Sequence, residues 1–114
     1  MNGIQEARGA SPERRLIEMR NMARDKAYDW IANRFDYLHK IEIVSCLRED
    51  SWYNVTAKFV KLIRQEELDK YIPGDYIYKW YEKKLQITFE NGKPVVLGYG
   101  KTIELTDWKV GADY

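Results

Sequence analysis

The sequence is poor in the residues that build metal sites and disulfide scaffolds. It has one cysteine, Cys46, and one histidine, His39, in 114 residues. A single cysteine cannot close an intramolecular disulfide, and one histidine with one distant cysteine does not make a histidine-cysteine zinc site. We therefore expect no disulfide and no bound metal. A lone thiol also suits a reducing cytoplasm.

Strong net charge and long apolar runs are also missing. Nineteen basic residues against eighteen acidic residues give a formal net charge of +1, so no overall field favours nucleic acid or an anionic membrane. No apolar stretch approaches the ~20 residues that a bilayer-spanning helix needs, and the N-terminal residues lack the apolar core of a signal peptide. The chain has the size of a single domain with its own core. The sequence therefore predicts one cytoplasmic domain.

The motifs of common enzyme classes do not occur either. Phosphate-binding glycine loops, nucleophile elbows and metalloprotease helices are absent from the sequence. The acidic pairs Glu49 with Asp50 and Glu66 with Glu67 fall in expected surface turns, where both carboxylates stay ionised and cannot divide the acid and base roles. The single histidine has no securely placed carboxylate to orient it. We expect no catalytic residue and no cofactor, and we class the chain as a non-enzyme.

A long helix is predicted near the N-terminus. Residues 1–10 are polar, so we expect a disordered leader. Ser11 caps free amides and Pro12 suits the first helical position, so the helix starts there and runs to about Phe35. Apolar residues spaced by three and four form one stripe for packing. The stripe consists of Leu16, Met19, Ala23, Ala27, Trp30 and Ile31, widened by Met22, Tyr28 and Phe35.

Alternating patterns after the helix predict strands. A first strand over residues 41–44 leads into a polar turn at 48–51, and a second strand covers 52–63. A charged connector at 64–71 precedes Pro73, which cannot donate to a sheet ladder, so the third strand starts after it. Residues 76–89 suit one bent strand or two short ones. Alternation puts Tyr53, Val55, Ala57 and Phe59 on one side of the second strand, and Lys83, Leu85, Ile87 and Phe89 on one side of the third.

A hairpin completes the predicted fold. Asn91 and Gly92 readily adopt the positive φ values of a type I′ turn, so residues 95–105 return antiparallel. Gly98 and Gly100 indicate a bulge or a close backbone approach beside Tyr99. The prediction is an α+β fold in which a long N-terminal helix packs on a roughly four-stranded antiparallel sheet. The domain spans residues 11–106, and 107–114 form a tail.

Aromatic residues are the feature best able to carry function. Nine Tyr, four Trp and three Phe gather mostly after position 52, and neighbours such as Trp80 and Tyr81 point to opposite sides of a strand. The helix cannot cover both sides, so some of these rings are available as binding anchors. Core and cross-strand packing is the alternative for most of them. The predicted partner-binding residues are Trp52, Tyr76, Tyr78, Trp80, Tyr81 and Tyr99.

Two further alternatives stay open at this stage. Aromatics interleaved with lysines are typical of single-stranded nucleic-acid platforms, on which bases stack and amines meet phosphates. A small ligand would instead need a deep pocket with convergent polar groups. The lysines concerned are Lys79, Lys83, Lys84 and Lys101.

A series of short motifs follows in order along roughly residues 23–105. Their residues are Trp52, Val55, Ala57, Phe59 and Val60, then Ile72, Pro73 and Asp75, then Tyr81 and Glu82, then Gly92, Gly98 and Tyr99. This order of motifs resembles the gas vesicle protein O family. The resemblance implies a non-enzymatic, cytoplasmic accessory protein of gas vesicle assembly that binds other gas vesicle proteins.

Another kind of protein also needs only a compact recognition surface. The second hypothesis is a small viral or phage protein that binds and inhibits a host complex. A homodimer is a further possibility, with a long strand such as 76–89 at a sheet edge pairing with its copy.

Overall fold

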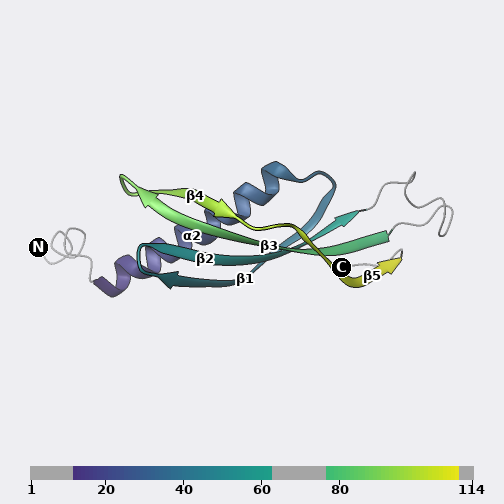
Figure 1. Cartoon of the computed structure of the whole chain (residues 1–114), viewed down its shortest axis with the longest axis horizontal. Coiled ribbons are helices and arrows are strands. Elements are labelled where there is room, and N and C mark those ends of the chain that lie inside the picture. The colour runs from purple at the N-terminus through teal and green to yellow at the C-terminus, as the bar shows by residue number, and fades with distance from the viewer. Residues whose placement is uncertain (1–11, 63–76, 111–114) are drawn as a thin grey trace, which may run out of the picture.

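The computed structural model describes residues 12–62 and 77–110, and it has one helix and five strands within these ranges (Figure 1). The elements are α2 (Pro12–Arg34), β1 (Leu38–Glu49), β2 (Trp52–Leu62), β3 (Ile77–Glu90), β4 (Lys93–Tyr99) and β5 (Ile103–Val110). The predicted α+β fold is confirmed. The predicted leader, the connector at 64–71 and residues 111–114 lie outside the described residues. No helix in the described ranges is both long enough and apolar enough to cross a membrane.

The sheet is an antiparallel meander in the order β1-β2-β3-β4, and β5 also pairs with β3. β4 pairs with residues 85–90 of β3, and β5 pairs with residues 77–82 of the same strand. The other edge of β3 is bonded to β2 along most of its length. β3 is therefore an interior strand, and the expectation that it forms a sheet edge is wrong. The outer strands are β1 on one side and β4 with β5 on the other.

The third predicted strand is one continuous element of 14 residues. The predicted return strand is instead divided, because the ladder is interrupted at residues 100–102. The amide of Gly100 donates to the carbonyl of Lys84 at 2.9 Å at this break, and a register shift falls beside Gly98. The irregularity expected around these glycines is present. Residues 107–110, which the sequence assigns to a tail, continue β5.

Short turns fix the register of the two hairpins. Asn91 and Gly92 have φ values of 53° and 77°, as the predicted type I′ turn requires. Asp50 and Ser51 connect β1 to β2, and Asp50 has a φ of 46°. Aspartate tolerates this left-handed region better than most residues. The polar turn predicted at 48–51 is therefore tighter than expected, since β1 continues to Glu49.

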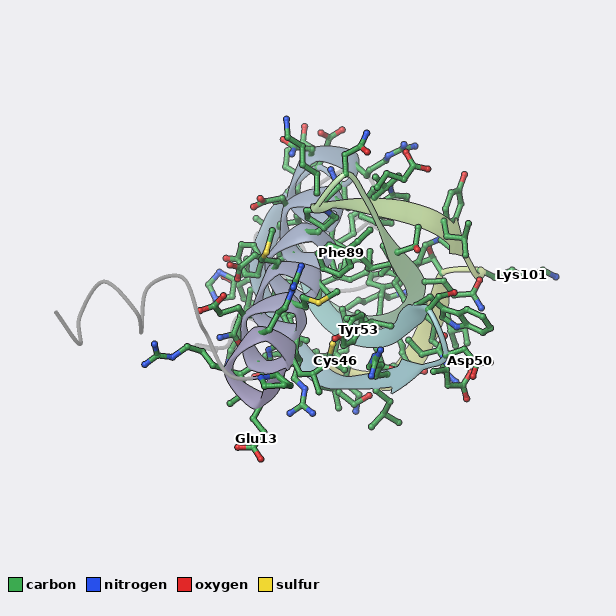
Figure 2. The ribbon with its side chains drawn as sticks, turned by 90° about the vertical axis from the view of Figure 1, so that its left-hand side faces the viewer. Glu13, Cys46, Asp50, Tyr53, Phe89 and Lys101 are labelled. Atoms are coloured by element: carbon green, nitrogen blue, oxygen red, sulfur yellow. The ribbon has the colours of Figure 1, made fainter. Side chains whose placement is uncertain are left out.

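The core lies between α2 and one side of the sheet, which we call the helix side. Ala23, Ala27 and Ile31 are fully buried there, against alternate residues of β2 and β3. Tyr53, Cys46 and Phe89 project from the sheet toward the helix (Figure 2). The opposite side of the sheet, the open side, carries no helix from the described part of the chain (Figure 1).

The apolar arc of the helix is narrower than predicted. Leu16, Met22 and Tyr28 are exposed. Two of the three fully buried helical residues are alanines. The helix therefore approaches the sheet closely along a narrow stripe, and the larger side chains on either side of this stripe stay exposed to solvent. A 23-residue helix is about 35 Å long, whereas a 14-residue strand reaches about 46 Å. The start of β3, the end of β2 and β5 extend past the helix (Figure 1).

Candidate binding surface

Strand alternation divides the predicted partner-binding residues between the two sides of the sheet. Trp80 pairs with Val60 and Tyr78 with Leu62, and both are on the open side, as is Trp52. Tyr81 is on the helix side, where its ring stacks on Phe59 at 5.5 Å. Tyr99 is on the helix side too, opposite Leu85. Tyr76 lies outside the described residues. The five described rings therefore do not form one surface.

The three rings on the open side are also separated along the strands. Trp52 stands eight residues before Val60, the partner of Trp80, and this is about 26 Å of extended chain. Its indole donates to the Asn54 side chain at 3.1 Å. Tyr78 lies against His39, with ring centroids 4.8 Å apart. Packing within the sheet explains these contacts, and such packing is the alternative to a binding role that the sequence leaves open for most of the aromatic residues.

Aromatic and cationic side chains gather on the helix side, near the C-terminal end of α2. We call this group the aromatic-basic cluster. It consists of Trp30, Arg34, Phe35, Lys61, Tyr81, Lys83, Tyr99 and Thr102.

Trp30 is the centre of the cluster. The guanidinium of Arg34 lies 4.6 Å from the centroid of its indole, and the Tyr99 ring lies 4.9 Å from it. The four-residue spacing of Trp30 and Arg34 puts both on one helix surface. Cations favour the face of an indole because of its quadrupole, so this contact fixes the guanidinium at the end of the helix.

Lys83 is the most unusual residue of the cluster. Only 6% of its surface is exposed, and its amine donates to the Thr102 hydroxyl at 3.1 Å. The same amine lies 4.8 Å from the Tyr99 ring and 5.6 Å from the Trp30 ring. Burial lowers the pKa of Lys83, and the nearby charge of Arg34 lowers it further. Lysines are rarely buried without a carboxylate partner.

The local sequence explains why this lysine turns inward. Lys83 stands between Tyr81 and Leu85 in the alternation of β3, so its side chain must leave the strand on the helix side. Its neighbour on β2 is Ala57, whose small side chain leaves room for the long stem. The break between β4 and β5 then brings Thr102 to the amine.

The charge of the cluster is not neutralised among the described residues. The ion pairs there are Lys40 with Glu42 and Lys79 with Glu104. Neither Arg34 nor Lys83 takes part in them. Lys61 lies 5.8 Å from the Phe35 ring and 5.9 Å from the Tyr81 ring, which adds a third cation. The cluster is therefore a local basic site in a chain of nearly balanced charge.

Sequence reasoning found only part of this cluster. It named Tyr81 and Tyr99 as partner-binding residues and placed Lys83 on the same side of its strand as Leu85. It missed the contribution of Trp30, which it assigned to the packing stripe, and of Arg34 and Thr102. The four-residue spacing from Trp30 to Arg34 was the available signal, but nothing local connects either residue with β4 or β5.

Cys46 is another buried titratable group on the same side of the sheet. Its thiol lies 3.9 Å from the Arg20 carbonyl and is largely inaccessible. Burial raises the pKa of the thiol, while the charges of Arg24 and Arg20 act in the lowering direction. In the described ranges, no three metal-binding side chains come together.

A broad hollow of about 640 Å³ lies on the open side of the sheet. Its side-chain lining is mostly polar, and Gly98 and Gly100 form part of its wall. The residues that contribute side chains are Ser45, Leu47, Asn54, Thr56, Lys84 and Gln86, with Tyr99 at the margin. A small ligand bound in this hollow would meet these side chains.

Comparison with protein-family profiles, curated proteins and solved structures finds no match to this chain. The similarity to the gas vesicle protein O family accordingly stays a prediction from the residues quoted above.

Proposed function

We propose that this chain is a non-enzymatic binding protein that holds another protein at the aromatic-basic cluster. The observation that carries the proposal is Tyr99, a residue that is 58% exposed while its ring contacts Trp30 and the amine of Lys83. Exposed tyrosines make good binding anchors because they bring a large area with few rotatable bonds. Contacts with two neighbours hold this ring in place before any partner arrives, which reduces the entropy lost on binding.

The motif resemblance supplies the proposed setting. We propose a cytoplasmic accessory role in gas vesicle assembly, with other gas vesicle proteins as partners. Tyr99 belongs both to the motif that carries the resemblance and to the cluster. A homodimer through an outer strand would use β1, β4 or β5, because β3 is interior.

A direct binding experiment tests this function. The purified chain is immobilised and exposed to a panel of purified gas vesicle shell and accessory proteins. We expect Tyr99→Ala to weaken the retained interaction by roughly tenfold or more, as for a central interface anchor. Trp80→Ala is the matched control, because it removes an aromatic ring from the open side of the sheet.

The outcomes separate the hypotheses. Binding of a gas vesicle protein that is lost in Tyr99→Ala and kept in Trp80→Ala supports the proposal. Loss in Trp80→Ala alone would move the interface to the open side. Failure of every gas vesicle protein to bind would reject the gas vesicle role, and capture of an unrelated complex in a second experiment with host lysate would favour the inhibitor hypothesis. Circular dichroism of each variant establishes that it is folded.

A further inference from the structure

Two cations share the centre of the aromatic-basic cluster, and neither forms an ion pair with another described residue. Arg34 and Lys83 lie within 4.6 Å and 5.6 Å of the same indole, that of Trp30. Glu104, which β5 brings toward the helix side, is 2.7 Å from Lys79 and thus already paired. Like charges held close together in a partly dry site favour the arrival of an anion.

We propose that Arg34 and Lys83 bind the carboxylate of an aspartate or glutamate side chain of the partner protein. The inference rests on the proposed function and specifies the chemistry of the partner: its contact segment is acidic. The guanidinium of Arg34 offers a planar fork of donors that matches the two oxygens of a carboxylate. The amine of Lys83 has further protons beyond the one given to Thr102.

The surroundings strengthen such a contact. The Thr102 hydroxyl accepts from Lys83, so its own proton is available for a carboxylate oxygen. Trp30 and Tyr99 flank the amine with apolar surface, and charge interactions are stronger where water is excluded. Tyr99 remains exposed and forms the rim over which the acidic segment would lie.

The same geometry argues against single-stranded nucleic acid. Base stacking needs open ring faces, but Phe35 and Tyr81 both lie against Phe59, and Trp30 lies against Tyr99 and Arg34. The lysines of the nucleic-acid hypothesis are also dispersed. Lys79 is ion-paired, Lys84 is on the open side, and Lys101 points away from the helix (Figure 2).

Titration with a defined probe tests the site. Hexaglutamate peptide is added to the ¹⁵N-labelled chain at physiological ionic strength, and the Trp30 indole signal and the Lys83 and Tyr99 amide signals are followed. We expect saturable shifts at these three positions. Lys83→Met keeps the apolar stem and removes the charge, and Arg34→Met does the same at the helix end. Each is expected to weaken binding by about tenfold or more.

Controls keep the result interpretable. Lys84→Met removes the same charge one residue along β3 but on the open side, and it should bind as the parent does. Thr102→Val replaces Lys83→Met in this titration if Lys83→Met does not fold. It should weaken hexaglutamate binding because it removes one polar contact.

Three results would overturn the inference. They are unchanged affinity in both Lys83→Met and Arg34→Met, equal weakening in Lys84→Met, and tighter cluster-dependent binding of oligothymidylate than of hexaglutamate. The last result would assign the cluster to phosphates. The carboxylate site and the proposed function can also be separated. If a gas vesicle protein no longer binds Tyr99→Ala but still binds Lys83→Met and Arg34→Met, the proposed function stands and the carboxylate site is rejected.

Discussion

The Tyr53 hydroxyl is buried in the core without a hydrogen-bond partner among the described residues. The residue is 2% exposed, and its ring meets Phe89 edge-on at 6.0 Å. A buried polar group with no partner loses its bonds to water and regains none. The ring of Tyr53 therefore stabilises the core, while its hydroxyl opposes folding.

Replacing this hydroxyl should not weaken the protein. We expect Tyr53→Phe to raise the free energy of unfolding by up to about 1 kcal/mol, measured by urea denaturation. Tyr99→Phe is the control, since it removes an exposed hydroxyl and should change stability by less than about 0.5 kcal/mol. A loss of stability in Tyr53→Phe would mean that the hydroxyl has a partner beyond the described residues.

Lys83 and Cys46 predict opposite responses of stability to alkaline pH. The folded-state pKa of Lys83 lies below its ordinary value of 10.5, so between these two pKa values the unfolded chain holds more protons and stability rises with pH. The folded-state pKa of Cys46 lies above its ordinary value of 9.0, so the folded chain holds more protons and stability falls as pH rises above 9.0.

Single variants separate these two contributions. The free energy of unfolding is measured from neutral pH to 10.5 for the parent, Lys83→Met and Cys46→Ala. We expect the alkaline slope to become less positive in Lys83→Met and more positive in Cys46→Ala. Identical slopes in all three proteins would contradict both shifts.

At the scale of elements, the hairpin between β3 and β4 shows where a glycine is required. Gly92 has a φ of 77°, yet a Cβ atom at this position would meet nothing within 4 Å. Only the backbone conformation opposes a side chain there. We expect Gly92→Ala to lower the free energy of unfolding by roughly 1 kcal/mol, measured by chemical denaturation.

Gly98→Ala is the matched control for this turn. Its φ is outside the left-handed region, and its added Cβ would make an ordinary 3.5 Å contact with the Gln86 side chain. A smaller cost than that of Gly92→Ala is expected. An equal cost at both positions would show that general strand propensity, and not the positive φ, sets the penalty.

The elements were largely predictable because their signals are local. Each signal depends on a few neighbouring residues. Examples are the helix start at Ser11 and Pro12, the alternation from Tyr53 to Phe59, and the turn at Asn91 and Gly92. The division of the return strand and the interior position of β3 depend on pairing between distant segments. The cluster was less predictable for the same reason, because Trp30 meets Tyr99 only after the whole sheet has formed.

At the scale of the whole molecule, helix coverage divides the sheet into two unequal environments. α2 contacts β1, β2, β3 and β4, and the fully buried core residues concentrate under it. The other end of the sheet extends past the helix (Figure 1). The aromatic-basic cluster stands at the boundary, where the end of the helix leaves the sheet side accessible. A partner bound there would contact both a rigid core and the strands beyond it.

The placement of the helix before every strand also affects how the chain emerges from the ribosome. At about 5–20 residues per second, β3 is completed roughly 3–11 s after α2. During this interval only β1 and β2 are available to cover the inner surface of the helix. That surface carries little apolar area at Ala23 and Ala27, where the side chains are single methyl groups, and more at Ile31. We therefore expect the small residues that allow close packing in the finished protein also to limit the apolar area that the helix exposes during synthesis.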